Sequence, residues 1–329
     1  MAKGRRIRFV VDDTGASRWY RAEVPGDELR RRGHHVTIGN RLDRSEVPSL
    51  DVVVFHRQFL PGAVAAIEHV NASGKVSVYD IDDDYWNVPP TNPLYERWRD
   101  PGLLRGLEAC VRAAQVVTTP SPVLAESLRG LNPVVRVLPN MLRGEDWPLP
   151  ERRESERVVI GWGGSASHLP DLRMLAGAIE QVLASEPRAE FRTHGLREVP
   201  FAPGDRLRVL PGVPLEDYPS LVASFDVGLA PLEDTRFNRC KSDLKVLEYA
   251  AAGVAVAASK VAPYERAVRP GETGLLVGPS AKDWLKAVRR LVTDGSLRAG
   301  MGRAGRAWAE TRFIERDANI GRWEKAYGL

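Results

Sequence analysis

Short apolar runs alternate with amphipathic helical patterns along this chain, and that alternation constrains the fold more than any other feature. In the first half, the runs that predict strands are residues 7–11, 35–38, 52–55, 76–79, 116–118 and 134–137. In the second half, they are residues 158–161, 190–194, 207–210, 227–231, 254–258 and 274–277. Strands that alternate with helices form βαβ units and parallel sheets. The sequence therefore predicts an α/β protein with two doubly wound, Rossmann-like parallel sheets.

The segments between these runs have the spacing of helices. Helical patterns lie near residues 18–32, 61–72, 103–114 and 121–129. A further helix is predicted to start at Pro170-Asp171, because an apolar stripe follows it. The members of that stripe are Leu172, Leu175, Ala176, Ile179, Val182 and Leu183. Residues 308–329 are also interpreted as a helix, whose large apolar side chains serve packing.

One segment interrupts the alternation. Residues 139–157 hold Pro139, Pro148 and Pro150 and then a charged run. A chain of 329 residues is long enough for two ordinary domains. We therefore expect a domain over residues 1–139, a linker over 140–157 and a second domain over 158–310. Ligands of open parallel sheets bind beyond the carboxyl ends of the strands, so we expect the site in a cleft that the two domains face.

Composition narrows the setting and the partners. The net charge is +4, from 47 basic and 43 acidic residues, and this excess is too small to indicate nucleic acid by itself. Cys110 and Cys240 are too few for a zinc cluster or a disulfide framework, which favours a reducing, cytoplasmic location. The most apolar window, residues 246–258, is too short and too polar to span a bilayer. Any membrane contact is expected to be peripheral.

A glycine-rich turn follows the strand that begins at Val158. Its sequence, Gly161-Trp-Gly-Gly-Ser-Ala-Ser-His168, lets backbone N–H groups approach a phosphate. The spacing Gly161-x-Gly163-x-x-Ala166 also matches a relaxed dinucleotide fingerprint, as in an NAD(P)-dependent oxidoreductase. That fingerprint needs an acidic residue after the next strand, where this chain has His194-Gly195. We favour a nucleoside diphosphate here over NAD, and over a tight turn with no ligand.

A second motif combines two lysines and a glutamate. Lys241 and Lys245 lie at the start of a helix predicted from about residues 242–243 to Gly253. An anion between the two lysines would offset their repulsion. Glu248 lies one turn further along the same face, where its carboxylate can accept hydrogen bonds from both hydroxyls of a ribose. The alternative is a solvated helix face with a Lys245–Glu248 ion pair.

Together these motifs resemble those of the GT-B glycosyltransferases, and among them the family 4-like retaining enzymes that use nucleotide-sugar donors. The resemblance is carried by Gly-Trp-Gly-Gly-Ser-x-Ser-His and by Lys-Ser-x-x-Lys-x-x-Glu-Tyr-x-Ala-x-Gly-x-x-Val, and it covers roughly residues 158–278. It implies that the C-terminal domain binds the donor and that Glu248 holds the ribose. It also implies retention of configuration, no metal, and a final helix over 311–329 that crosses back to the N-terminal domain.

The donor-binding residues that this resemblance implies surround the two motifs. They are Gly163, Gly164, Ser165, His168, His194, Gly212, Val213, Asn238, Lys241, Ser242, Lys245 and Glu248. The family often carries two glutamates separated by seven residues, and the first of them falls here at Cys240. We expect the loop 237–242 to supply the sugar contacts instead. No permanently bound cofactor is expected, because the nucleoside-diphosphate sugar is a co-substrate.

An acidic segment, Tyr79-Asp-Ile-Asp-Asp-Asp84, ends one predicted strand. Clustered carboxylates form a metal site, act as a base whose pKa is raised by crowding, or cap a solvated loop. The metal site ranks lowest, since GT-B enzymes generally need no metal. The catalytic candidates are Asp82 and Asp83, with Lys245 on the donor side. Asp84 is assigned to acceptor binding.

The loop after the first strand supplies the other acceptor-binding candidates. Gly15 permits a tight turn, while Arg18, Tyr20 and Arg21 either bind an anionic group or simply start a helix. His56 ends another strand on the same edge, although a lone histidine is more often structural.

The predicted activity is transfer of a sugar, of the hexosyltransferase type, from a nucleoside-diphosphate sugar. Catalysis would come from positioning and from stabilisation of the leaving diphosphate. The acceptor stays open among a cell-surface glycan, a lipid-linked intermediate, a small metabolite and a modified DNA base. An NAD(P)-dependent oxidoreductase and a non-catalytic nucleotide- or sugar-binding module are the alternatives.

Overall fold

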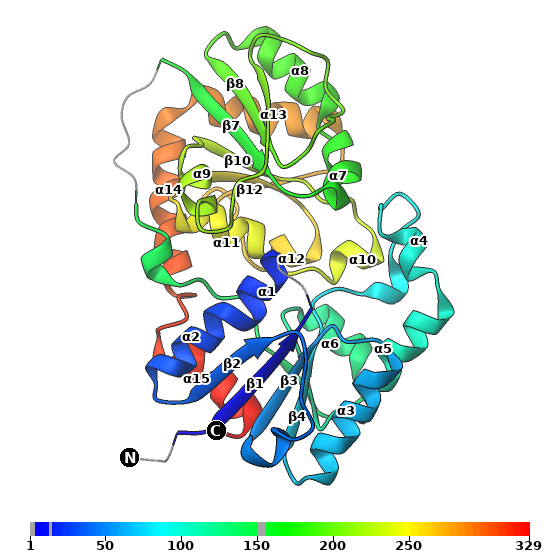
Figure 1. Cartoon of the computed structure of the whole chain (residues 1–329). Helices are drawn as coiled ribbons and strands as arrows, with labels where there is room; N and C mark the ends of the chain where they lie inside the picture. The colour runs from blue at the N-terminus through cyan, green and yellow to red at the C-terminus, as the bar shows by residue number, and fades with distance from the viewer. Residues whose placement is uncertain (1–3, 13–14, 150–155) are drawn as a thin grey trace.

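Each of the two predicted strand sets forms one parallel sheet in the computed structural model, which describes residues 4–12, 15–149 and 156–329. Within these ranges, the strand orders are β2-β1-β3-β4-β5-β6 and β12-β11-β10-β7-β8-β9. Neighbouring strands pair in parallel in both sheets. The strand order reverses at β1 and β3 in the first sheet and at β7 and β10 in the second. The predicted doubly wound α/β class is confirmed (Figure 1).

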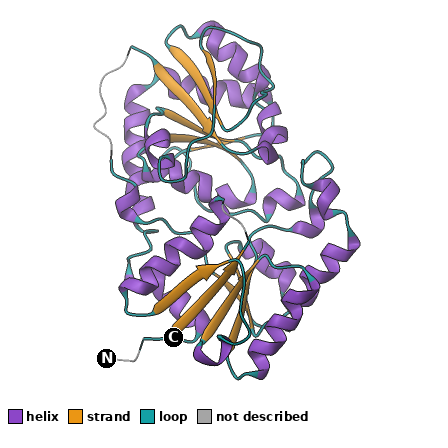
Figure 2. Cartoon of the chain, viewed as in Figure 1, coloured by secondary structure: helices purple, strands orange, loops and turns teal. Residues whose placement is uncertain are grey.

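The strands begin and end within two residues of the predicted runs. The first sheet contains β1 Arg6–Val11, β2 His35–Gly39, β3 Val52–His56, β4 Val76–Asp80, β5 Val116–Thr119 and β6 Val135–Val137. The second contains β7 Val158–Gly163, β8 Ala189–His194, β9 Leu207–Leu210, β10 Val227–Ala230, β11 Ala255–Ser259 and β12 Leu275–Val277. Central strands such as β3 are buried along their whole length, as expected when helices cover both faces of a sheet (Figure 2).

Helices connect the strands and cover the faces of both sheets. The first half contains α1 Ala16–Arg18, α2 Val24–Arg31, α3 Pro61–Ala72, α4 Tyr95–Trp98, α5 Pro101–Ala113 and α6 Pro122–Leu128. The second half contains α7 Leu169–Arg173, α8 Ala176–Ser185, α9 Tyr218–Ala223, α10 Arg236–Arg239, α11 Leu244–Ala251, α12 Ala262–Glu265, α13 Ala281–Thr293, α14 Gly295–Glu310 and α15 Asp317–Tyr327. A π-helical turn, Trp19–Glu23, joins α1 to α2.

Two predicted helices are each divided in the structure. The stripe from Leu172 is split between α7 and α8, because the backbone N–H of Leu175 bonds to Leu172 in a tight turn. The predicted C-terminal helix is split between α14 and α15. There the backbone of residues 312–314 leaves the helical path and pairs with Leu142.

The chain passes between the two sheets at residues 138–149 and again at 311–316, where Leu142 and Phe313 form a backbone bridge. After the second crossing, α15 packs against α2 and β5 of the first half (Figure 1). Tyr327 lies edge-on to Phe9 of β1, with ring centroids 6.1 Å apart. One continuous hydrophobic cluster runs through the crossings and covers one face of each sheet. None of the helices among the described residues is long and apolar enough to cross a membrane.

Candidate functional site

A cavity of about 470 Å³ lies where the carboxyl ends of the two sheets face each other. It is lined by both halves of the chain and contains most of the predicted site residues. The predicted residues on its wall are Tyr20, Arg21, Asp82, Asp83, Gly163, Gly164, Ser165, His168, His194, Gly212, Val213, Lys241, Ser242, Lys245 and Glu248. The position follows the rule for doubly wound sheets, because β7 ends at the point where the strand order reverses.

The glycine-rich turn forms one wall of the cavity. Gly163 ends β7 beside His194 of β8, and the N–H of Gly164 donates to the His194 carbonyl at 3.1 Å. The next turn passes very close, because a Cβ on Gly195 would lie 2.3 Å from the carbonyl oxygen of Gly164. Gly195 also has φ of +91°, a conformation that favours glycine. The two turns are therefore held together by backbone contact, which a side chain at Gly195 would break.

Gly161, the first residue of the relaxed dinucleotide fingerprint, does not serve a ligand. A Cβ at this position would lie 2.0 Å from the ring of Phe225, so the missing side chain makes room for packing inside the second half. This explanation removes one of the observations that favoured an NAD site.

The lysine–glutamate motif meets the glycine-rich turn. Lys245 lies in the first turn of α11, where its Nζ donates to the carbonyl of Gly163 and lies 5.4 Å from the centre of the Trp162 ring. Burial lowers the pKa of Lys245, and the nearby carboxylates of Glu248 and Asp171 offset this effect only in part. A phosphate anion bound beside Lys245 would reverse the shift, because it favours the charged ammonium.

Glu248 is buried on the same face of α11, with only 5% of its surface exposed. Its carboxylate accepts a hydrogen bond from the Tyr20 hydroxyl, 2.8 Å away in the first half of the chain. Burial raises the pKa of Glu248, while Lys245 and the hydroxyls of Tyr20 and Tyr218 counteract the rise. The alternative of a solvated helix face is therefore wrong, and Glu248 is a carboxylate held by contacts from both halves.

Asp171 is a buried carboxylate that holds His168 and Asn238 on the donor side of the cavity. His168 Nδ1 lies 2.8 Å from Asp171, whose other oxygen accepts from the backbone of Glu233 at 2.8 Å and from Asn238 at 3.1 Å. Burial lowers the pKa of His168, so the ring favours its neutral form. His194 is held in a similar way, since its Nδ1 lies 3.3 Å from the carbonyl of Pro211.

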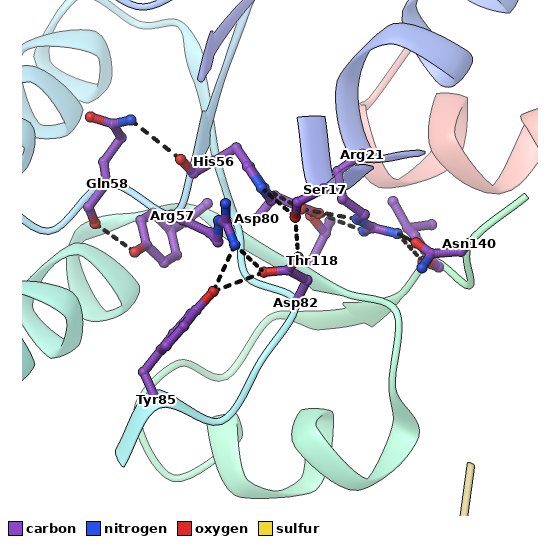
Figure 3. A network of polar contacts seen from close by, with 12 residues as sticks. Ser17, Arg21, His56, Arg57, Gln58, Asp80, Asp82, Tyr85, Thr118 and Asn140 are labelled. Atoms are coloured by element: carbon purple, nitrogen blue, oxygen red, sulfur yellow. Dashed lines mark hydrogen bonds and ion pairs between the residues drawn. The ribbon is translucent and has the colours of Figure 1, made fainter. Parts of the chain in front are cut away.

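On the opposite wall, a polar network lies at the carboxyl ends of β3 and β4 (Figure 3). Arg21 donates twice to Asp80, at 3.0 and 2.6 Å, and once to Asn140 at 3.1 Å. His56 Nδ1 lies 2.9 Å from Asp80, and His56 Nε2 lies 3.1 Å from the Ser17 hydroxyl. Burial opposes ionisation of Asp80, but Arg21 outweighs it and holds the pKa of Asp80 well below its usual range.

The acidic segment does not act as one cluster, because its carboxylates point to different partners. Asp82 lines the cavity and hydrogen-bonds Ser17, and Asp83 lies 3.3 Å from Lys241 across the cavity. Asp84 is buried against Asn87, away from the cavity. Burial raises the pKa of Asp82, but Arg57 and His56 outweigh it, so the net shift is downward. The expectation that crowding raises a pKa is therefore wrong for Asp82.

The structure does not bring every candidate to the cavity. Gly15, Arg18, His56, Asp84 and Asn238 all lie outside its lining. Arg18 instead pairs with Glu23 at 2.8 Å, and His56 lies behind Ser17. Asn238 turns inward because Asp171 and the carbonyl of Glu233 accept from its amide, so of the loop 237–242 only Lys241 and Ser242 reach the cavity.

Arg21 lines the cavity, yet its guanidinium is buried and bonded to Asp80, Asn140 and the carbonyl of Leu138. Residues 13 and 14, which belong to the segment after the first strand, lie outside the described residues. Among the residues that are described, no group of three or more His, Cys, Asp or Glu side chains is arranged to hold a metal ion.

Several lining residues were not predicted as site residues: Ser17, Arg57, Asn140, Tyr218 and Tyr264. Ser17 lies in the segment after the first strand that the sequence had singled out, and Arg57 directly follows a strand, so both positions carried a signal. Tyr218 and Tyr264 carried none, because aromatic residues near helix starts are common in packed cores.

The second half of the chain is similar to a known protein family. Residues 157–294 match the family Glycosyl transferases group 1. A curated D-inositol 3-phosphate glycosyltransferase from Nocardia farcinica is 28% identical over 248 residues, which cover 72% of this chain and 47% of that protein. A protein of the same name from Pseudarthrobacter chlorophenolicus is 34% identical over 117 residues, 35% of this chain and 27% of that protein. The chain thus spans about half, or less, of the length of these relatives.

Solved structures match nearly the whole chain in fold. The sucrose-phosphate synthase of Thermosynechococcus elongatus superposes with a TM-score of 0.71 at 16% identity, over 98% of both chains. HepE of Anabaena, in complex with UDP and glucose, gives a TM-score of 0.69 at 14% identity, over 99% of this chain and 100% of that one.

The two facing Rossmann-like sheets with the cavity between them define the GT-B fold class. Residues 157–294 match the family Glycosyl transferases group 1, so the second half of the chain is similar to that family, and the chain as a whole has the GT-B fold.

Proposed function

We propose that this chain transfers a sugar from a nucleoside-diphosphate sugar to the hydroxyl of an acceptor. One observation carries the proposal: the glycine-rich turn, Lys245 and Glu248 converge on one wall of a cavity whose other wall carries Asp82 and Ser17. Cations and backbone N–H groups suit a diphosphate, and a carboxylate suits the hydroxyls of a ribose. In this proposal the acceptor lies against the opposite wall.

Each donor-side residue has a defined role in this proposal. Lys245 and Lys241 neutralise the charge that develops on the diphosphate as it leaves, which is the main electrostatic contribution to such a reaction. Lys241 exchanges its present partner, Asp83, for the phosphate. Glu248 accepts hydrogen bonds from the ribose, and Tyr20 and Tyr218 orient its carboxylate.

The finer assignments belong to the same proposal. Residues 1–139 bind the acceptor, residues 158–310 bind the donor, residues 140–157 link them, and residues 311–329 cross back. Transfer proceeds with retention and without a metal, as the resemblance to family 4-like enzymes implies. The cytoplasm is the proposed location, because Cys110 and Cys240 are buried, free thiols.

UDP is the first nucleotide to test, because HepE of the same fold was solved with UDP and glucose. The acceptor classes to screen are glycans, lipid-linked intermediates, small metabolites and modified DNA bases. D-inositol 3-phosphate joins the small metabolites, because the curated relatives are named for it.

The experiment is a thermal-shift panel with UDP, GDP, dTDP, ADP, CMP and NAD, each with Mg²⁺ and with a chelator. A ligand that binds the native state raises the melting temperature by mass action. We expect one nucleoside diphosphate to raise it equally with and without Mg²⁺. A shift with NAD alone would replace the proposal by the oxidoreductase alternative. Binding of UDP-glucose with neither transfer nor hydrolysis would indicate a non-catalytic binding module. The anomeric configuration of the product, read by proton NMR, tests retention.

A further inference from the structure

Ser17, His56 and Asp80 form a line of polar contacts at the carboxyl end of the first sheet (Figure 3). Ser17 is half-buried and lines the cavity, whereas His56 and Asp80 are buried at the ends of β3 and β4. Ser17 Oγ lies 3.1 Å from His56 Nε2, and His56 Nδ1 lies 2.9 Å from Asp80 Oδ1. A hydroxyl, an imidazole and a carboxylate in this order can pass a proton inward, because the carboxylate stabilises the imidazolium that forms.

Asp80 determines which nitrogen of His56 carries a proton. Arg21 donates to both oxygens of Asp80, and Thr118 donates to one of them at 2.5 Å, so the carboxylate is ionised and accepts hydrogen bonds only. The His56 nitrogen that faces it is therefore the one with a hydrogen, namely Nδ1. In the neutral ring, Nε2 then presents its lone pair to Ser17.

Asp82 completes the relay on the cavity side, because it also hydrogen-bonds the Ser17 hydroxyl. This hydroxyl has one proton, so it donates either to His56 or to Asp82. When His56 takes up a proton, Nε2–H donates to Ser17 and Ser17 donates to Asp82. Every contact in the line is then satisfied.

Two carboxylates and two guanidinium groups lie around His56. Asp80 of β4 and Asp82 in the following loop are opposed by Arg21 of the π-helical turn and by Arg57, whose Nη1 lies 3.7 Å from Asp82. An imidazole is well suited to proton transfer near neutral pH. Asp82 is a weaker base, because its contacts with Arg57 and Ser17 stabilise its ionised form.

We propose that Ser17 and His56 remove the proton from the acceptor hydroxyl during sugar transfer, an inference that rests on the proposed function. The bond from the anomeric carbon to the diphosphate breaks, and the diphosphate keeps the electron pair. The bond from the anomeric carbon to the acceptor oxygen forms, the acceptor proton moves to Ser17 Oγ, and the Ser17 proton moves to His56 Nε2. Nothing is oxidised or reduced, and His56 later releases its proton to solvent. Ser17 touches the substrate, while His56 and Asp80 act through it.

The first test needs no turnover. The protein is labelled with ¹⁵N-histidine, and the variant His56→Gln assigns the His56 resonances. In the neutral ring we expect Nδ1 to be protonated and Nε2 bare, and we expect Ser17→Ala to shift Nε2 much more than Nδ1. Protonation of both nitrogens up to about pH 9 would overturn the proposal, because a permanently charged ring cannot accept a proton. This result would leave the proposed function untouched.

The second test uses hydrolysis of UDP-glucose, in which water is the acceptor. We expect Ser17→Ala and His56→Gln to lower kcat by about 100- to 10,000-fold, with the Kd of UDP changed less than about twofold. Ser17→Thr keeps the hydroxyl and should retain most of kcat. Ser49→Ala removes an exposed hydroxyl that donates to the nearby Glu46 carbonyl, far from the cavity lining, and it is the matched control.

Two results of the second test would overturn the relay. One is a kcat of Ser17→Ala within about threefold of the wild type, and the other is a glycosyl adduct on Ser17 detected by mass spectrometry. The adduct would make Ser17 a nucleophile instead. If UDP does not bind, or if UDP-glucose is bound but not turned over, the proposed function is in question, and the NMR test still decides whether the relay exists.

Discussion

Replacement of Glu248 by glutamine tests the ribose site with almost no change of shape. The carboxylate is buried and receives the Tyr20 hydroxyl at 2.8 Å, so the amide can keep this contact. A hydrogen bond to a charged group contributes about 1.5–3 kcal/mol, and a neutral one about 0.5–1.5 kcal/mol. Two ribose hydroxyls that lose a charged acceptor therefore lose about 2 kcal/mol together, which is roughly a 30-fold rise in the Kd of UDP.

The assay is isothermal titration of UDP and of 2′,3′-dideoxy-UDP at about pH 8, well above the ordinary pKa of a glutamate, because burial raises the pKa of Glu248. We expect Glu248→Gln to weaken UDP but to change dideoxy-UDP less than about twofold, because the latter lacks both hydroxyls. Glu216→Gln, on an exposed loop, is the control. Equal weakening of both nucleotides would refute the reasoning, since Glu248 would then shape the cavity without binding the ribose.

The same carboxylate predicts a pH dependence: because its pKa is raised, UDP binding should weaken as the pH falls through that raised value, and Glu248→Gln should abolish this titration. Tyr20→Phe removes a donor that lowers the pKa of Glu248, so UDP affinity should begin to fall at a higher pH than in the wild type. Asp80→Asn leaves a buried guanidinium without its charge partner and should lower the free energy of unfolding by about 3–5 kcal/mol in urea titrations. Because the pKa of Asp80 is depressed in the folded state, its ionised form stabilises the wild type above about pH 4, and this contribution is lost as the pH falls further. The free energy of unfolding of the variant should therefore lack this acid-sensitive contribution. Gly195→Ala should destabilise the fold and weaken UDP binding. Gly177→Ala in α8, where a Cβ meets open space, should stabilise the fold by about 0.5–1 kcal/mol. Equal melting temperatures for these two variants would contradict the argument from backbone contact at Gly195.

The parts of the fold and the site that could be predicted are those with a local signal. The strands could be predicted from apolar runs with turn residues between them. Because the strands of each sheet are parallel, their carboxyl ends then lie at the same edge of the sheet. For this reason the glycine-rich turn and Lys245 could be expected at one site, and the structure places them in contact. The two helix breaks could not be expected: a tight local turn at Leu175 separates α7 from α8, and a long-range backbone bridge between Leu142 and Phe313 separates α14 from α15.

The partners of the predicted side chains were much harder to infer. Glu248 meets Tyr20 from 228 positions earlier, and no periodicity links the two. Arg21 looked like an anion ligand, but the buried Asp80 accepts from its Nε and Nη2, and the carbonyl of Leu138 and the side chain of Asn140 accept from its Nη1. Asn238 looked like part of the donor loop, yet one turn of helix in α10 aims it at Asp171. Long-range pairs of this kind leave no trace in the spacing of a sequence.

The position of α15 has a consequence for the order in which the molecule assembles. Trp323 and Tyr327 are completely buried, one beside Arg21 and the other beside Phe9 of β1. The first sheet is synthesised early, but the part of its face that α15 covers stays exposed until these residues arrive, after the whole second sheet. During synthesis its exposed apolar face is a target for aggregation and for chaperones. Folding of the first half is therefore tied to completion of the second, and an interrupted chain would lack both a donor site and a finished core.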